Sequence, residues 1–126
     1  MFKVILFPIY QSKGKFEATY KAIQLVKNRQ NHIIMLSVVS SHHPVKAPEL
    51  TTSQLNRAQE KIREENNTCD VIKRQGKPSF VICDVADDFN VDLIVIGTQG
   101  MNLEKEYKST AAQVIQLAPC PVLVVP

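Results

Sequence analysis

The sequence predicts a single α/β domain over residues 1–126, built on a five-stranded parallel sheet with helices on both faces. Apolar runs without polar alternation recur along the chain, and such runs are typical of strands that are buried on both faces. Segments with apolar residues at helical spacing separate these runs. Hydrophobic residues make up 44% of the 126 residues and charged residues 21%, so one packed core suits the whole length.

Five strands are expected along the chain. The first covers residues 3–8 and contains the run Val4-Ile5-Leu6-Phe7. The other four are expected at residues 32–39, 69–73, 92–96 and 121–125. Strands that are joined through helices pair in parallel, and such crossovers are right-handed almost without exception. The regular alternation of strand and helix therefore indicates one parallel sheet.

Four helices are expected between the strands. The apolar residues at helical spacing are Phe16, Tyr20, Ile23 and Val26 in the first helix, and Leu55, Ala58 and Ile62 in the second helix at residues 54–66. Pro78 suits the first position of the third helix, because its missing N–H would be unpaired there in any residue. The fourth helix is expected at about residues 109–117, and the prolines of segment 40–53 predict a loop.

Charge and hydropathy exclude several classes of protein. The formal net charge is +3 and the two signs are interspersed, so the basic block of a nucleic-acid-binding protein is missing. The apolar runs are too short for a signal peptide or a membrane span. We therefore expect a cytoplasmic protein without nucleic-acid or membrane partners.

Cysteines and histidines give no sign of a metal site. The chain has an odd number of cysteines without a Cys-x-x-Cys spacing, namely Cys69, Cys83 and Cys120. Reduced thiols are therefore expected, with Cys83 buried in a helix. The adjacent His42 and His43 have no partner cluster, whereas real zinc sites bring three or four ligands. No metal is expected.

The turns after the first and fourth strands are the candidate ligand site. In an open parallel sheet, ligands bind beyond the carboxyl ends of the strands where the strand order reverses. If the fourth strand lies beside the first, the segments 9–14 and 97–108 frame that crevice, with Gly97 and Gly100 allowing close backbone approach to an anion. Ser109 and Thr110 are expected at the start of the last helix. These residues equally fit plain turns and a helix cap, and their convergence favours anion binding.

The sequence resembles the universal stress protein family over almost its whole length. The resemblance rests on the first strand with Pro8 and Ile9, on DLIVIGTQG at 92–100, on APCPVLVV at 118–125, and on Gly76-Lys77-Pro78 before the third helix. It implies a Rossmann-like sheet in strand order 3-2-1-4-5. In many members it also implies an ATP site, and homodimers that join through the last strand.

The resemblance assigns site residues position by position. Tyr10, next to Ile9, stands where the family has an aspartate that meets adenosine, and Ser12 matches a serine two places on. Val38 corresponds to a valine that contacts adenine. The family's phosphate motif is carried by Gly97 and Gly100, with Lys108 at the place of its last glycine, Ser109 at the following Ser/Thr, and Thr110 next to it. The loop between Gly100 and Lys108 is two residues shorter than in the family.

These departures predict weak or absent ATP binding. Tyr10 supplies no carboxylate, and the β-carbon of Lys108 obstructs the close approach that glycine allows, although its ammonium could pair with a phosphate. Losing one charge-assisted hydrogen bond costs about 1.5–3 kcal/mol, which is roughly ten- to a hundredfold in affinity. The sequence places no Ser/His/Asp or Cys/His combination and no paired carboxylates near the crevice. We expect a non-enzymatic, homodimeric regulatory module that contacts another protein, with no certain cofactor; the alternative is a sensor of ATP, AMP or another adenine nucleotide.

Overall fold

The computed structural model describes residues 3–9, 24, 31–39, 52–64, 68–97 and 105–125. Its elements are β1 (Val4–Ile9), β2 (His32–Val39), α2 (Thr52–Arg63), β3 (Thr68–Gln75), α3 (Pro78–Asp88), β4 (Leu93–Gly97), α4 (Lys105–Leu117) and β5 (Val122–Val125). Apart from residue 24, which is helical, the helix expected between the first two strands falls outside the described residues, as do Tyr10, Ser12 and Gly100.

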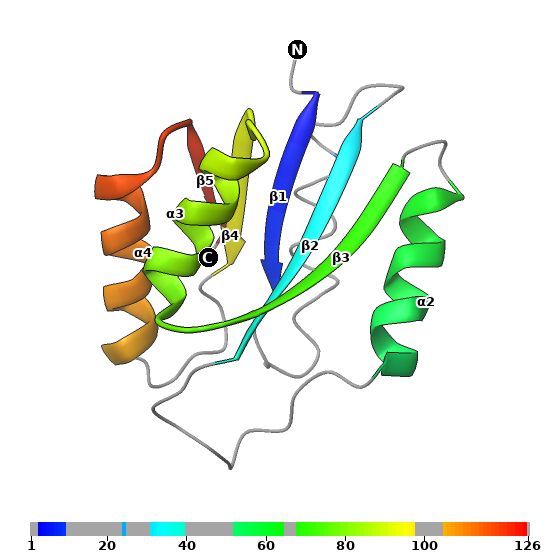
Figure 1. Ribbon diagram of the computed structural model, residues 1–126, viewed down its shortest axis with the longest axis horizontal. Coiled ribbons are helices and arrows are strands. Elements are labelled where there is room, and N and C mark those ends of the chain that lie inside the picture. The colour runs from blue at the N-terminus through cyan, green and yellow to red at the C-terminus, as the bar shows by residue number, and fades with distance from the viewer. Residues whose placement is uncertain are drawn as a thin grey trace.

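The five strands form one sheet in the order β3-β2-β1-β4-β5 (Figure 1). Each neighbouring pair is parallel, from the pairing of β2 with β3 to that of β4 with β5. The predicted fold class and strand order are therefore confirmed. The chain begins in the middle of the sheet with β1, adds β2 and β3 on one side, and then crosses to β4 and β5 on the other.

The strand predictions are correct to within two residues at each end, and β2 matches its prediction at both ends. The prediction for the last helix is wrong at its start, because α4 begins at Lys105, four residues before residue 109. The segment Lys-Glu-Tyr-Lys at 105–108 contains no Gly or Pro, and lysine and glutamate are good helix formers. The helix therefore extends through residues that we expected to be a linker.

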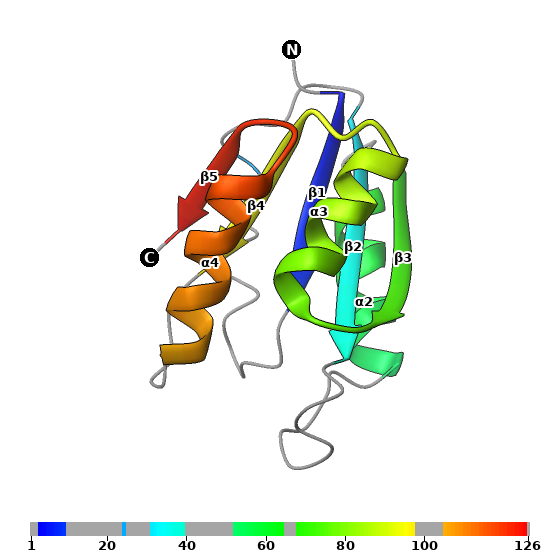
Figure 2. The same cartoon turned by 60° about the vertical axis from the view of Figure 1, so that its left-hand side comes forward.

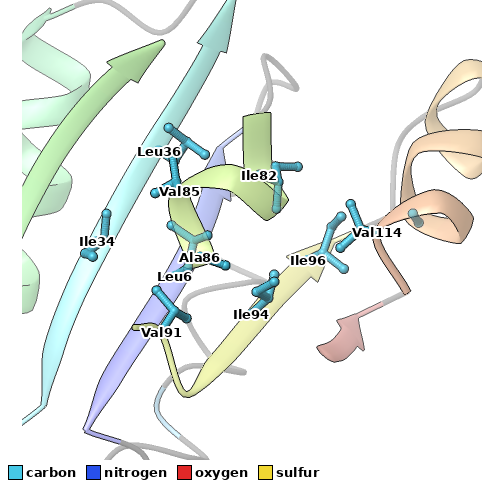
Figure 3. Packing of buried hydrophobic residues seen from close by; sticks show 11 residues of the cluster. Leu6, Ile34, Leu36, Ile82, Val85, Ala86, Val91, Ile94, Ile96 and Val114 are labelled. Carbon is cyan, nitrogen blue, oxygen red and sulfur yellow. The ribbon is translucent and has the colours of Figure 1, made fainter. Parts of the chain in front are cut away.

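Helices cover both faces of the sheet (Figure 2). On one face α2 packs through Ile62 against Ile5, Ile33 and other residues at odd positions of β1 and β2. On the other face the core joins strand residues at even positions to α3 and α4. Figure 3 shows this second cluster, whose labelled members are Leu6, Ile34, Leu36, Ile82, Val85, Ala86, Val91, Ile94, Ile96 and Val114. Burying one such Ile or Leu side chain contributes about 1.5–3 kcal/mol.

The turn from β3 into α3 is fixed by a glycine and a proline. Gly76 has a φ of +145° and donates its N–H to the Val39 carbonyl at 3.0 Å. Pro78 is the first residue of α3, as predicted. Phe80 on the same helix is not part of the core, since it is 52% exposed, and the Lys77 ammonium lies 4.9 Å from the centre of its ring.

The three cysteines are free thiols. Cys69 is buried, and burial raises its pKa to about 12, with the Arg63 charge opposing that rise. Cys83, expected to be buried, is half-buried and packs against the core on the α3 and α4 face. In the described part of the chain, no helix is long and apolar enough to cross a bilayer, and His, Cys, Asp and Glu side chains form no group that could hold a metal ion.

Candidate functional site

β1 and β4 are neighbours at the point where the strand order reverses, and the register partners that join them lie in the amino-terminal halves of the two strands. Ile5 and Leu6 of β1 are register partners of Leu93 and Ile94 of β4, while β1 pairs with β2 on its other side. The adjacency on which the predicted crevice depends is therefore present. A parallel sheet binds ligands beyond this edge, because the following loops diverge there to opposite faces.

Three of the predicted site residues lie at or next to the last residue of a strand at this edge. Ile9 is the last residue of β1 and pairs with Ser37 of β2. Gly97 is the last residue of β4 and pairs with Val125. Val38, one residue before the end of β2, is half-buried and packs against the core on the α3 and α4 face. The backbone thus brings these three residues to the edge where the resemblance requires them.

The expectation that Ser109 and Thr110 begin the last helix is wrong. Because α4 begins at Lys105, Lys108 is the fourth residue of the helix and the two hydroxyl residues follow it. Only about the first four amides of a helix lack partners within it. The amides that a bound anion could use are therefore those near Lys105, and Ser109 and Thr110 are too far along the helix to cap it.

A buried polar contact between α3 and α4 was not found from the sequence. Ser79 is 1% exposed and donates its hydroxyl to Oε1 of Gln113 at 2.6 Å. Gln113 lies one helical turn after Ser109 and Thr110, so this bond fixes the rotation of the α4 face that carries them. A serine directly after Pro78 looks like an ordinary first-turn residue, and nothing in the sequence pairs it with a glutamine 34 positions away.

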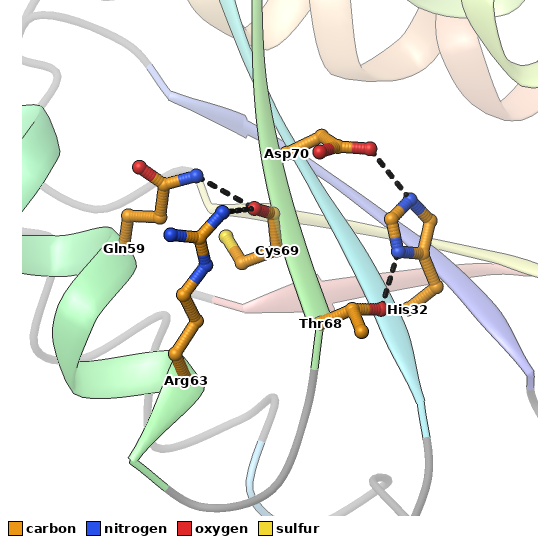
Figure 4. A network of polar contacts seen from close by, with 6 residues as sticks. All are labelled: His32, Gln59, Arg63, Thr68, Cys69 and Asp70. Carbon is orange, nitrogen blue, oxygen red and sulfur yellow. Dashed lines mark hydrogen bonds and ion pairs between the residues drawn. The ribbon is translucent and has the colours of Figure 1, made fainter.

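A second polar cluster lies at the amino ends of β2 and β3 (Figure 4). His32 contacts Thr68 through Nδ1 at 2.6 Å and Asp70 through Nε2 at 3.1 Å. On the other side of β3, Gln59 and Arg63 of α2 donate to the Cys69 carbonyl at 2.6 and 3.1 Å. These donors cover a carbonyl on the outer edge of β3, where strands of other molecules could otherwise pair.

Asp92 ties the amino ends of β1 and β4 together. Its Oδ2 accepts the backbone N–H groups of Lys3 and Val4 at 2.9 and 3.0 Å, and its own N–H donates to the Val4 carbonyl at 2.8 Å. A carboxylate that accepts two amide hydrogens makes strong, charge-assisted bonds. Asp92, the first residue of the DLIVIG motif, therefore has a structural role at the amino ends of the strands, away from the proposed crevice at their carboxyl ends.

Comparison with known proteins agrees with this architecture. The sequence model of the universal stress protein family matches residues 1–126. A universal stress protein of Synechocystis sp. is 42% identical over 136 residues, which cover 100% of this chain and 87% of that protein.

Solved structures share the fold. The hypothetical protein MJ0577 superposes with a TM-score of 0.80 at 22% identity, covering 99% of this chain and 96% of the other. A universal stress protein family protein from Arabidopsis thaliana, solved with AMP bound, superposes with a TM-score of 0.66 at 17% identity, covering 98% of this chain and 90% of the other. The family match over the full length, with the strand order 3-2-1-4-5, leads to one conclusion: this chain belongs to the universal stress protein family.

Proposed function

We propose that the chain is a homodimeric regulatory module of the stress response that acts by contacting another protein. Its nucleotide site has lost some of the residues that bind nucleotide in the family. The observation that carries the proposal is the pairing of β1 with β4, whose carboxyl ends bear Ile9 and Gly97. This is the place where a sheet of this order binds nucleotides. In this proposal the crevice keeps its place in the sheet, while some of the family's side chains are exchanged.

Two exchanged residues support weak nucleotide binding. Tyr10 follows the end of β1 and brings a phenol where a carboxylate would accept hydrogen bonds from ribose. Lys108 is the fourth residue of α4 and stands at the position where the phosphate motif of the family has glycine. Its ammonium can pair with a phosphate as a point charge, so a smaller anion remains a suitable ligand for the crevice.

The edge strand β5 supports assembly into homodimers. β5 pairs with β4 on one side only, since it ends the strand order. Its sequence is apolar throughout, and Val124 is 39% exposed. An exposed apolar edge strand can pair with a strand of another molecule. The β5 strand of a second copy, related by two-fold symmetry, would be such a strand. A monodisperse monomer in solution scattering would count against this assembly.

The alternative function is a sensor of ATP, AMP or another adenine nucleotide. The AMP found in the Arabidopsis thaliana relative supports it, as do Gly97 at the end of β4 and Val38 near the end of β2. Residues 10, 12, 100 and 108–110 would then complete the ligand shell together with Ile9.

Calorimetry with ATP and magnesium, and with AMP, decides between the two functions. Absence of heat at high micromolar protein supports the module with a weakened site, and micromolar affinity supports the sensor. Tyr10→Asp combined with Lys108→Gly restores both family residues and is expected to raise ATP affinity by roughly ten- to a hundredfold for each restored interaction. The matched control is Lys61→Gly on α2, on the sheet face away from α4. If the double variant binds no better than the parent chain, the crevice is not a nucleotide site.

A further inference from the structure

Three side chains at the amino ends of β2 and β3 form a hydrogen-bonded chain at the edge of the sheet opposite the proposed crevice (Figure 4). Thr68 Oγ1 lies 2.6 Å from His32 Nδ1, and Asp70 Oδ2 lies 3.1 Å from Nε2 of the same ring. A hydroxyl, an imidazole and a carboxylate in this order are the parts by which proteins activate a nucleophile.

The carboxylate determines which ring nitrogen acts as the base. In a neutral imidazole one nitrogen donates a hydrogen and the other accepts one, and an ionised carboxylate can only accept. Nε2 of His32 is therefore the donor to Asp70, and Nδ1 is the acceptor. The Thr68 hydroxyl must then donate its hydrogen to Nδ1, over a distance of 2.6 Å. This is the reach that a general base needs to remove a proton.

Two paired strands hold the groups in place. His32 and Thr68 are register partners, and Asp70 follows two residues later on the same face of β3. Backbone bonds from His32 to Lys3 at 2.8 Å and from Thr68 to Asn31 at 3.1 Å fix both strands at this point. The His32 and Asp70 side chains are 34% and 64% exposed, so a small substrate can reach them.

The amide of Cys69 is a candidate donor for a developing oxyanion. The N–H of Thr68 points toward β2, where it donates to Asn31. Successive amides of a strand point to opposite sides, so the N–H of Cys69 points toward the outer edge of β3, beside the Cys69 carbonyl to which Gln59 and Arg63 donate.

We propose that Thr68 and His32 form a second site, independent of the proposed nucleotide crevice, that hydrolyses small activated esters. Thr68 Oγ1 attacks the ester carbonyl carbon while its proton passes to His32 Nδ1. The bond from that carbon to the leaving oxygen then breaks, and His32 gives the proton to the leaving oxygen. Water next loses a proton to His32 and attacks the acyl carbon, and the freed Thr68 oxygen recovers the proton. One ester and one water give one acid and one alcohol, and Asp70 is the positioning residue for the ring.

The test measures hydrolysis of p-nitrophenyl acetate by the full chain in mildly alkaline buffer. General base activation contributes at least about a hundredfold, so Thr68→Val and His32→Gln are each expected to lower nitrophenolate release by about that factor. Thr68→Ser keeps the hydroxyl and is expected to retain the activity. Asp70→Asn is expected to lower kcat and leave KM unchanged, while the exposed Asp88→Asn on α3 is the matched control without effect.

Mass spectrometry after rapid quenching identifies the acylated residue. An acetyl group on the peptide that contains Thr68, lost in Thr68→Val, supports the proposal. Acetyl groups on lysines alone, or an unchanged rate in Thr68→Val, would overturn it. If Thr68→Val does not fold, as judged by circular dichroism, the comparison of His32→Gln with Thr68→Ser decides in its place, and equal rates in those two variants refute the proposal.

Discussion

Replacing Gly76 by alanine is expected to destabilise the fold by about 2–6 kcal/mol, the sum of a backbone cost and a packing cost. The φ of +145° lies where residues with a β-carbon are rarely found, and such strain costs about 1–3 kcal/mol. The added β-carbon would lie 2.9 Å from Cγ2 of Val81. Valine in a helix has one strongly preferred rotamer, so this methyl group does not turn away. Overpacking of this kind costs about 1–3 kcal/mol.

Urea unfolding measures the effect as a lower midpoint at an unchanged slope. Val81→Ala removes the methyl group that the new β-carbon would meet, so the double variant is expected to recover the packing cost but not the backbone cost. The coupling free energy from this double-mutant cycle should be about 1–3 kcal/mol. Gln75→Ala, an exposed neighbour in β3, is the control and should change stability by less than about 0.5 kcal/mol. A Gly76→Ala variant as stable as that control would refute the strained turn.

Three further outcomes are expected. Ile82→Ala removes a fully buried side chain of α3 and should lower the free energy of unfolding in urea by about 2–5 kcal/mol. Ile115 on α4 is 55% exposed, so Ile115→Ala should lower it by less than about 0.5 kcal/mol. Equal losses in the two variants would contradict the packing of α3. Burial raises the pKa of Cys69 to about 12, above the value of 9.0 for an exposed thiol in the unfolded chain. The stability that the neutral thiol contributes is therefore complete below the unfolded pKa and is lost as pH rises through the folded pKa. Cys69→Ala should reduce the fall in stability over that alkaline range, and an identical pH profile would show that the thiol is not held in its neutral form. Val124→Lys should turn a dimer into a monomer in sedimentation analysis, while Phe80→Lys on α3 should leave the dimer intact; a dimer that survives Val124→Lys would exclude β5 from the interface.

Most of the strands were predictable because they contain apolar runs that periodicity alone identifies, whereas β3 carries charged residues at positions 70, 73 and 74. Val4 to Phe7 and the segment 32–39 have no polar alternation, and a strand buried on both faces requires none. The strand order came from the family resemblance, since periodicity does not determine which strands are neighbours. The structure confirms that order, and with it the adjacency of β1 and β4.

The start of α4 was missed because two signals conflicted. The family motif suggested a loop up to Lys108, and Ser109 and Thr110 have side chains that commonly cap helices. Helix propensity at residues 105–108 favoured an earlier start, and the helix begins at Lys105. Propensity decided the boundary here because neither Gly nor Pro interrupts the segment. The candidate donors to a phosphate are therefore the backbone amides of the first turn of α4, and not the hydroxyl groups of Ser109 and Thr110.

The His32, Thr68 and Asp70 cluster could not be predicted, because it depends on strand register. Its hydroxyl and imidazole come from positions 36 residues apart. A shift of one residue between β2 and β3 would move the His32 partner to the face occupied by Cys69. The expectation of a non-enzyme was drawn from the crevice, where the resemblance directs attention. The candidate nucleophile, Thr68, lies at the opposite end of the same sheet, so the proposed weakening of nucleotide binding and the proposed ester hydrolysis can be tested separately. Each is tested by variants that leave the other end untouched.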